Sequence, residues 1–141
     1  MPDFSGSLID HLNLPVTDLA ASVAFYTAAL APLGITTLIP VPADEAADQK
    51  AMHAFGVHPK PFFWLVAGAP VRYDADTHVA FTAPDRATVD AFHEAAVAAG
   101  ATTLRPPGEY PEYHPGYYGA FVADPDGINV EAVCHAGSLS D

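Results

Sequence analysis

The chain reads HLNLPVTDLAASVAFYTAALA at residues 11–31 and HVAFTAPDRATVDAFHEAAVA at residues 78–98, 67 positions later. The two stretches share a leading histidine, an aspartate and a phenylalanine, at His11 and His78, Asp18 and Asp85, and Phe25 and Phe92. Collinear identities over such a length indicate a duplicated structural unit. We therefore expect one domain spanning residues 1–141, built from two modules at about residues 8–68 and 77–134.

The repeat continues beyond these stretches with one deletion, at an offset of 66. The further matches join Thr36–Thr37–Leu38 to Thr102–Thr103–Leu104, Ala54–Phe55 to Ala120–Phe121, and Pro59 to Pro125. A single gap suffices to align both halves, which supports two copies of one unit.

Each copy begins with a strand and continues into a helix. Hydrophobic residues alternate along residues 8–16, with His11 and Asn13 on the less apolar face, and this alternation predicts a strand. Thr17 or Asp18 then caps a helix, and Gly34 follows its end. The other expected elements are strands at 35–41, 51–57, 62–67, 77–83, 102–105, 118–123 and 128–133, and a helix at 85–99. The outcome is an α+β chain with two tandem βαβββ units.

Two connecting segments have distinctive composition. Residues 106–117 contain four prolines and two glycines, which disfavours a regular strand ladder, and their aromatic side chains suit a lid over a pocket. Asp124–Pro125–Asp126–Gly127 predicts a tight turn between the last two strands, because proline fixes one dihedral angle and glycine permits a positive one.

Charge and cysteine content limit the possible partners and location. The net charge is -12, from five basic against 17 acidic residues, so nucleic acid and anionic membranes are not expected partners. Cys134 is the single cysteine, which excludes an intrachain disulfide. The N-terminal residues do not resemble a signal peptide, and no segment suits a spanning helix. We expect a cytoplasmic protein that binds a small-molecule substrate.

His11, His78 and Glu131 form the candidate metal site. The histidines occupy equivalent places in the two modules, so an approximate two-fold axis would bring them together, and Glu131 lies late in the second copy. Two imidazoles and one carboxylate suit a divalent ion, with Fe, Zn, Mn and Ni all open. The alternative is that His11 is a structural histidine, in which case its removal costs stability without changing metal content.

The residues that start and end the modules resemble the vicinal oxygen chelate superfamily. The resemblance lies in Asp10–His11–Leu12, Phe25–Tyr26 and the closing segment DPDGINVE at residues 124–131. It implies one incomplete mixed β-barrel around a central metal and ligand pocket, and a homodimer. That superfamily contains glyoxalase I, extradiol dioxygenases, fosfomycin-resistance enzymes and bleomycin-binding proteins.

The resemblance also limits the ligand set and the activity. In that superfamily the metal ligands come from the first and last strand of each module, and His11, His78 and Glu131 match three of these four places. The fourth place, in the last strand of the first module, falls on Trp64 or Leu65, neither of which binds metal. The chain therefore departs from glyoxalase I, which has a fourth protein ligand there, and matches the three-ligand pattern of extradiol dioxygenases and fosfomycin-resistance enzymes. We expect a metal-dependent lyase, isomerase or ring-cleaving dioxygenase that chelates a substrate through adjacent oxygens. A non-catalytic, bleomycin-resistance-like binding protein is the alternative, and a regulatory module ranks below both.

Further residues are candidates for the substrate pocket or its chemistry. Tyr118 and His114 are candidate acid–base groups. The candidate pocket residues are Asn13, Trp64, Tyr113, His114, Tyr118 and Asn129. Basic residues are too few to nominate an anion-binding clamp, although Arg72 and Arg105 could reach the pocket rim.

Overall fold

The computed structural model describes residues 3, 6–68 and 77–135; Arg72, a candidate rim residue, lies outside them. The chain forms eight strands, two α-helices and a short 3-10 helix within this part. The elements are β1 (Leu12–Val16), α1 (Leu19–Leu30), η1 (Ala31–Leu33), β2 (Thr36–Ile39), β3 (Met52–Val57), β4 (Lys60–Ala67), β5 (His78–Thr82), α2 (Arg86–Ala98), β6 (Thr102–Glu109), β7 (Tyr118–Ala123) and β8 (Asn129–Cys134).

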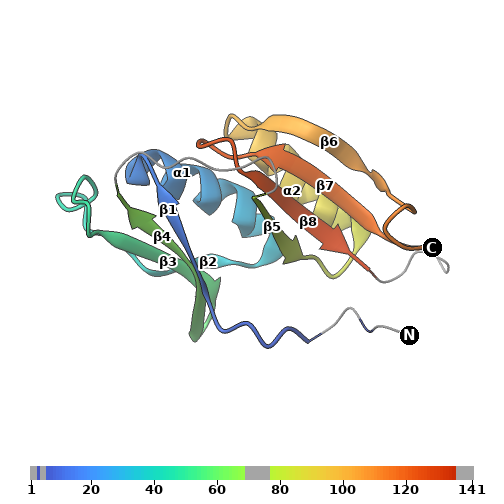
Figure 1. Cartoon of the computed structure of the whole chain (residues 1–141), viewed down its shortest axis with the longest axis horizontal. Coiled ribbons are helices and arrows are strands. Elements are labelled where there is room, and N and C mark those ends of the chain that lie inside the picture. Colours follow the sequence, from blue (N-terminus) through green and yellow to red (C-terminus); the bar gives the residue numbers. More distant parts are fainter. Residues whose placement is uncertain (1–2, 4–5, 69–76, 136–141) are drawn as a thin grey trace.

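The strands form two four-stranded sheets with the same topology, in the orders β1-β4-β3-β2 and β5-β8-β7-β6. In each sheet the first and last strand of the module pair in parallel, and the other neighbours pair antiparallel. Figure 1 shows the first sheet at lower left and the second at upper right. The sheets do not close into a barrel, which confirms the α+β class predicted from the repeat and agrees with the incomplete barrel that the resemblance implies.

Two strands differ from their predicted bounds. β1 begins at Leu12, so His11 precedes the strand rather than lying within it, and Leu8, predicted to lie on its apolar face, is exposed. β6 continues to Glu109, because its ladder shifts register between Arg105 and Gly108 and the two prolines fall in this irregular part. The strand predicted to end at residue 105 therefore extends to Glu109, and its proline-containing part is irregular, as the composition predicted.

Equivalent aspartates begin the two helices. The Asp18 side chain accepts a hydrogen bond from the Ala21 backbone N–H at 3.0 Å, and Asp85 accepts one from Thr88 at 2.7 Å. Such caps satisfy backbone donors that the first helical turn leaves free. No helix in residues 6–68 or 77–135 has the length and apolarity needed to cross a bilayer.

Both modules contribute to one hydrophobic core, in which α1 and α2 contact each other. A buried hydrogen bond also joins the modules: Tyr26 of α1 donates to Asp124 Oδ2, in the β7–β8 turn, at 2.6 Å. The Asp124 side chain accepts two backbone N–H groups as well, while burial raises the pKa of this carboxyl. The first module therefore helps to fix the turn that precedes β8.

His53 is a buried histidine of β3 whose hydrogen bonds define its neutral form. The Val41 backbone N–H donates to its Nδ1 at 3.1 Å, so the proton lies on Nε2, which is 2.8 Å from Thr37 Oγ1. Burial lowers the pKa of His53 below its ordinary value. Protonation of Nδ1 would break the Val41 bond.

Acid is therefore expected to destabilise the fold through His53. Above pH 6.5 the residue is neutral in both states; below it the unfolded chain takes up the proton first, so the unfolding free energy falls by at most about 1.4 kcal/mol per pH unit. Urea unfolding of wild type and His53→Gln between pH 7 and 5 should show a shallower fall in the variant. His93→Gln, outside the core cluster, is the control. Equal slopes for wild type and His53→Gln would contradict this assignment.

Candidate metal and substrate site

Parallel pairing of β5 with β8 places His78 beside Glu131. The register pairs His78 with Asn129 and Ala80 with Glu131, so the two side chains lie on neighbouring strands. His78 Nε2 is 2.7 Å from Glu131 Oε1. Glu131 is only 1% exposed, and a buried carboxylate of this kind requires a partner. The second module therefore brings together two of the three predicted ligands.

Tyr117 and Gly119 shape the other side of the Glu131 carboxylate. The Tyr117 hydroxyl donates to Glu131 Oε2. A Cβ atom at Gly119 would lie 2.8 Å from the same oxygen, so a side chain there would force the carboxylate to shift. The Phe121 ring, whose strand position pairs with Glu131, lies 5.8 Å from the His78 ring between centroids. One oxygen of Glu131 is thus held from β5, by His78, and the other by Tyr117, which directly precedes β7.

The electrostatics of the pair favour a charged form of His78. Its hydrogen bond to Glu131 raises the pKa of His78 above the ordinary value, although burial opposes this effect. Asn129 lies close enough to add to the increase, but its buried Oδ1 atom has no hydrogen bond of normal geometry among the described residues. Burial, and then the bond to Glu131, raise the pKa of Tyr117.

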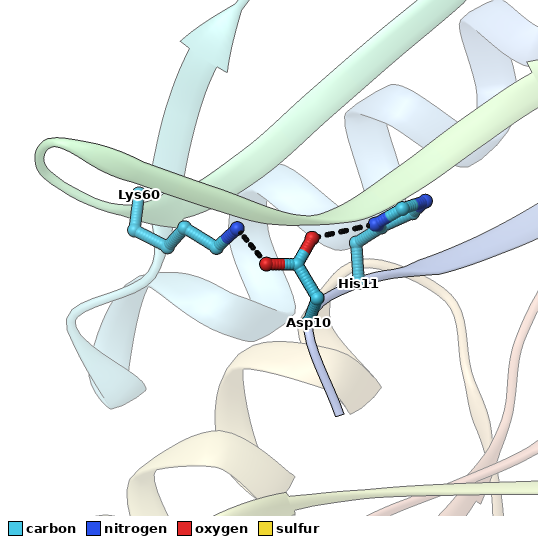
Figure 2. A network of polar contacts seen from close by, with 3 residues as sticks. All are labelled: Asp10, His11 and Lys60. Carbon is cyan, nitrogen blue, oxygen red and sulfur yellow. Dashed lines mark hydrogen bonds and ion pairs between the residues drawn. The ribbon is translucent and has the colours of Figure 1, made fainter. Parts of the chain in front are cut away.

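His11 belongs to a separate polar network at the start of β1. Its Nδ1 atom is 2.7 Å from Asp10 Oδ2, and Lys60, at the start of β4, donates to Asp10 Oδ1. Figure 2 shows Asp10 between the two, on the segment that enters β1. The contact at Nδ1 leaves Nε2 of His11 without a protein partner in this network. About half of the His11 side chain is exposed.

His11 and His78 line the same cavity, which has a volume of about 450 Å³. Its walls come from the β1 and β5 regions, with residues of β4, and are largely apolar; besides the histidines they include Ile9, Leu12, Phe62, Phe63, Val79 and Phe81. A cavity of this size and polarity suits a small organic molecule. A larger hollow, of about 700 Å³, lies beside α1 and is lined mainly by alanine and glycine, without either histidine. The smaller cavity is therefore the candidate site, because it has two histidine side chains that could bind a metal.

The three predicted ligands do not form one cluster within a single chain. In residues 6–68 and 77–135, no three His, Cys, Asp or Glu side chains are close enough together to hold one metal ion. His78 and Glu131 are adjacent, whereas His11 shares only the cavity with His78.

The structure identifies Trp64 as the counterpart of Glu131. Asn13 pairs with Trp64 in the first sheet as Ala80 pairs with Glu131 in the second, which corresponds to an offset of 67. The Ala54–Phe55 match at offset 66 is therefore out of register with the strands, since Phe121 and Ala54 are the equivalent positions. Trp64 and Asn13 also line a shallow hollow of about 330 Å³ with His11.

Two loop candidates lie near Tyr117. The Tyr113 and Tyr117 rings are 4.7 Å apart, and the His114 ring is 5.4 Å from that of Tyr117. His114 Nε2 is 2.8 Å from Nδ1 of His135, which the sequence did not single out. The loop therefore approaches the Glu131 side of the second sheet, although none of its residues lines the cavity that His11 and His78 share.

Tyr118 does not join these residues. Its hydroxyl donates to Asp90 of α2 at 2.7 Å, and the Arg86 guanidinium lies 4.9 Å from its ring. Successive residues of a strand point to opposite faces, so Tyr118 lies on the helix side and Tyr117 on the Glu131 side. This placement replaces Tyr118 by Tyr117 as the tyrosine of the site. Counting back in twos from Phe121, opposite Glu131, would have found it.

A family model for the glyoxalase/bleomycin resistance protein/dioxygenase superfamily matches residues 8–132. The chain belongs to this superfamily. No match is found among curated proteins. The superfamily match agrees with the residues that start and end each module.

Solved structures of this superfamily share the fold. A glyoxalase/bleomycin resistance protein from Albidiferax ferrireducens T118 is 29% identical, with a TM-score of 0.73 over 92% of this chain and 100% of that one. A domain from Frankia sp. EAN1pec is 22% identical, with a TM-score of 0.69 over 97% and 96% of the two chains. A glyoxalase I mutant from Zea mays is 26% identical, with a TM-score of 0.65 over 89% of this chain and 45% of that one.

Replacing Gly119 by alanine is expected to displace the Glu131 carboxylate and break its bond to Tyr117. Loss of a buried charged hydrogen bond costs about 1–3 kcal/mol of unfolding free energy, measurable by urea unfolding. Gly108→Ala in β6 is the matched control, since its Cβ would meet only Pro106 O at 3.9 Å. Equal stability of the two variants would show that Glu131 moves aside at no cost.

Proposed function

We propose that this superfamily member is a metal-dependent enzyme acting on a small substrate through two adjacent oxygens. The adjacent His78 and Glu131 side chains carry the proposal. Imidazole and carboxylate donors on one sheet face suit Fe, Zn, Mn or Ni, and a three-ligand set with His11 leaves positions for substrate. Lyase, isomerase and ring-cleaving dioxygenase chemistry all fit such a set.

The donor atoms of the second module fit a divalent cation. The two facing atoms, a ring nitrogen and a carboxylate oxygen, are 2.7 Å apart, and a divalent cation bound by both would take the place of the proton between them. The Asn129 Oδ1 atom nearby is buried without a partner among the described residues. These buried nitrogen and oxygen atoms are therefore better suited to bind a cation than to contact an apolar ligand.

The protein side chains around the pair have separable roles. Tyr117 holds the second oxygen of Glu131, which orients the first oxygen toward His78. Asp10 holds His11 by Nδ1, which leaves Nε2 as the donor atom. The largely apolar cavity walls would contact the hydrocarbon part of a substrate. When bound, a divalent ion supplies Lewis-acid stabilisation of negative charge on the substrate oxygens.

Metal content tests the proposal directly. Purified protein loaded in turn with Fe²⁺, Zn²⁺, Mn²⁺ or Ni²⁺ and then desalted is expected to retain about one ion per chain for at least one metal. His78→Ala, Glu131→Gln and His11→Ala each remove one donor, and each is expected to lower the retained metal at least tenfold, measured by elemental analysis.

His93→Ala, a histidine substitution on α2, is the control for these variants and should retain metal like wild type. Retention in His78→Ala and Glu131→Gln equal to that of wild type would sink the proposal. Retention unchanged in His11→Ala alone would restrict the site to the second module.

A non-catalytic binding protein similar to bleomycin-resistance proteins is the second candidate. The separation of His11 from the His78–Glu131 pair within one chain and the net charge of -12, which attracts cationic compounds, favour it. Thermal protection by a cationic ligand in a protein that retains no metal would support this candidate over the enzyme.

We also propose that the protein is a homodimer, with the exposed apolar residues near β1 in the interface. Ile9 and Leu12 are 79% and 41% exposed beside the cavity, and a partner would cover them. Light scattering after size-exclusion chromatography is expected to give twice the chain mass of 14.8 kDa. Leu12→Asp should shift the mass toward one chain, whereas Val97→Asp, at an exposed position on α2, should not; a monomeric wild type would contradict the dimer.

A further inference from the structure

Arg105 lies in the same cross-strand row as Glu131. In the second sheet Arg105 of β6 pairs with Phe121 of β7, and Phe121 pairs with Glu131 of β8. Residues opposite one another in a ladder point to the same face, so the three side chains share the face that carries His78. Because neighbouring strands are about 4.8 Å apart, the Arg105 and Glu131 backbones are separated by roughly 10 Å.

Aromatic side chains hold the Arg105 guanidinium in place. Its Cζ atom is 3.9 Å from the centre of the Tyr110 ring and 5.5 Å from that of Phe121. Nη1 donates to the Tyr113 hydroxyl at 2.9 Å. A guanidinium stacked on a ring and tethered at one nitrogen is already ordered, so little side-chain freedom is lost when it binds a planar anion.

The Glu112 carboxylate already binds the Arg105 guanidinium, but this ion pair is exposed and can be displaced. Arg105 Nη2 donates to Glu112 Oε2 at 2.8 Å, and the two side chains are 39% and 54% exposed. Exposed ion pairs are weak because water and salt compete with them. Glu112 therefore shows how a carboxylate sits on Arg105, and another carboxylate can replace it at small cost.

The other described cations have different positions. Arg86 makes similar contacts on the helix side, with Glu109 and the Tyr118 ring, Lys60 pairs with Asp10 beside the first sheet, and Lys50 lies in the segment between β2 and β3. An acidic chain repels anions at long range. Recognition of an anionic substrate on the Glu131 face therefore depends on a placed cation, and Arg105 is in that place.

We propose that Arg105, with Tyr110 and Tyr113, is a subsite for a carboxylate of the substrate. The substrate is then a small organic acid whose carboxylate displaces Glu112. Its identity as a substrate rests on the proposed function, whereas the carboxylate subsite does not.

Titration with sodium benzoate at constant ionic strength tests the subsite in the metal-free protein. The readout is the change in the ¹⁵N–¹H resonance of Arg105 Nε and in the neighbouring amides, with inorganic phosphate and benzyl alcohol as comparison probes. Benzoate is expected to bind and benzyl alcohol is not, because the neutral molecule lacks the charge-assisted hydrogen bonds. Phosphate binding at least as tight as that of benzoate would overturn the assignment to a carboxylate.

Four variants separate a binding role of Arg105 from a loop-fastening role. Arg105→Gln is expected to weaken benzoate binding about tenfold or more, and Arg105→Lys less, because charge remains without the planar fork. Glu112→Gln removes the competing carboxylate and is expected to strengthen binding about two- to fivefold. Arg86→Gln is the matched control on the opposite face and should not change it. Unchanged binding in Arg105→Gln, or no gain in Glu112→Gln, would overturn the proposal.

The outcome is distinguishable from failure of the proposed function. Glu131→Gln removes a proposed metal ligand and is expected to leave Arg105-dependent benzoate binding in place. A wild-type protein that retains no metal but binds benzoate through Arg105 would keep the subsite and reject only the metal-dependent activity.

Discussion

Parallel pairing between the first and last strand of each module is the constraint on which the site depends. The chain leaves β5, crosses through α2, turns back through β6 and β7, and returns beside its own starting strand as β8. This return brings the first residue of the module next to a carboxylate more than fifty residues later, as at His78 and Glu131. It also aligns β6, β7 and β8 so that side chains from three strands form rows on one face.

The same pairing in the first sheet produces a different surface. There the position opposite the β1 strand carries Trp64 instead of an acid, and His11 takes its carboxylate from the adjacent Asp10. Duplication therefore preserved the backbone arrangement while the two copies took different chemistry: one buried ion pair, and one half-exposed histidine beside an aromatic wall. Among the described residues, the two related sheets therefore differ at this matched position, which is a buried acid in the second sheet and Trp64 in the first.

Local signals in the sequence predicted much of the fold. The duplicated aspartates cap the helices because capping needs only a short side chain and the next three backbone N–H groups. The Asp124–Gly127 turn is likewise local, and Gly127 adopts the positive φ of 84° that such turns favour. The repeat predicted that His11, His78 and Glu131 converge, and in the described part of the chain only His78 and Glu131 come within hydrogen-bond distance.

The register of the strands and the sheet face to which each side chain points were harder to predict, because β-bulges and tertiary contacts determine them. Whether Trp64 or Leu65 matches Glu131 depends on where the single deletion lies in the alignment of the two modules. The match of Ala54–Phe55 with Ala120–Phe121 put the deletion before β3, whereas the strand register keeps the offset of 67 through β3 and β4. The choice between Tyr117 and Tyr118 depends on how the chain enters β7 from a proline-rich loop. The ion pairs of Asp10 and Arg105 depend on side chains that converge only after folding.

The contact between Gly119 and Glu131 links two positions that are twelve residues apart in the chain and adjacent in the sheet. A side chain at the first position would bring its Cβ to 2.8 Å from the carboxylate at the second, so the end of the acid would have to turn away from the Tyr117 hydroxyl. In this chain the smallest residue and a buried acid are therefore coupled positions, and a substitution at either one changes the space available to the other.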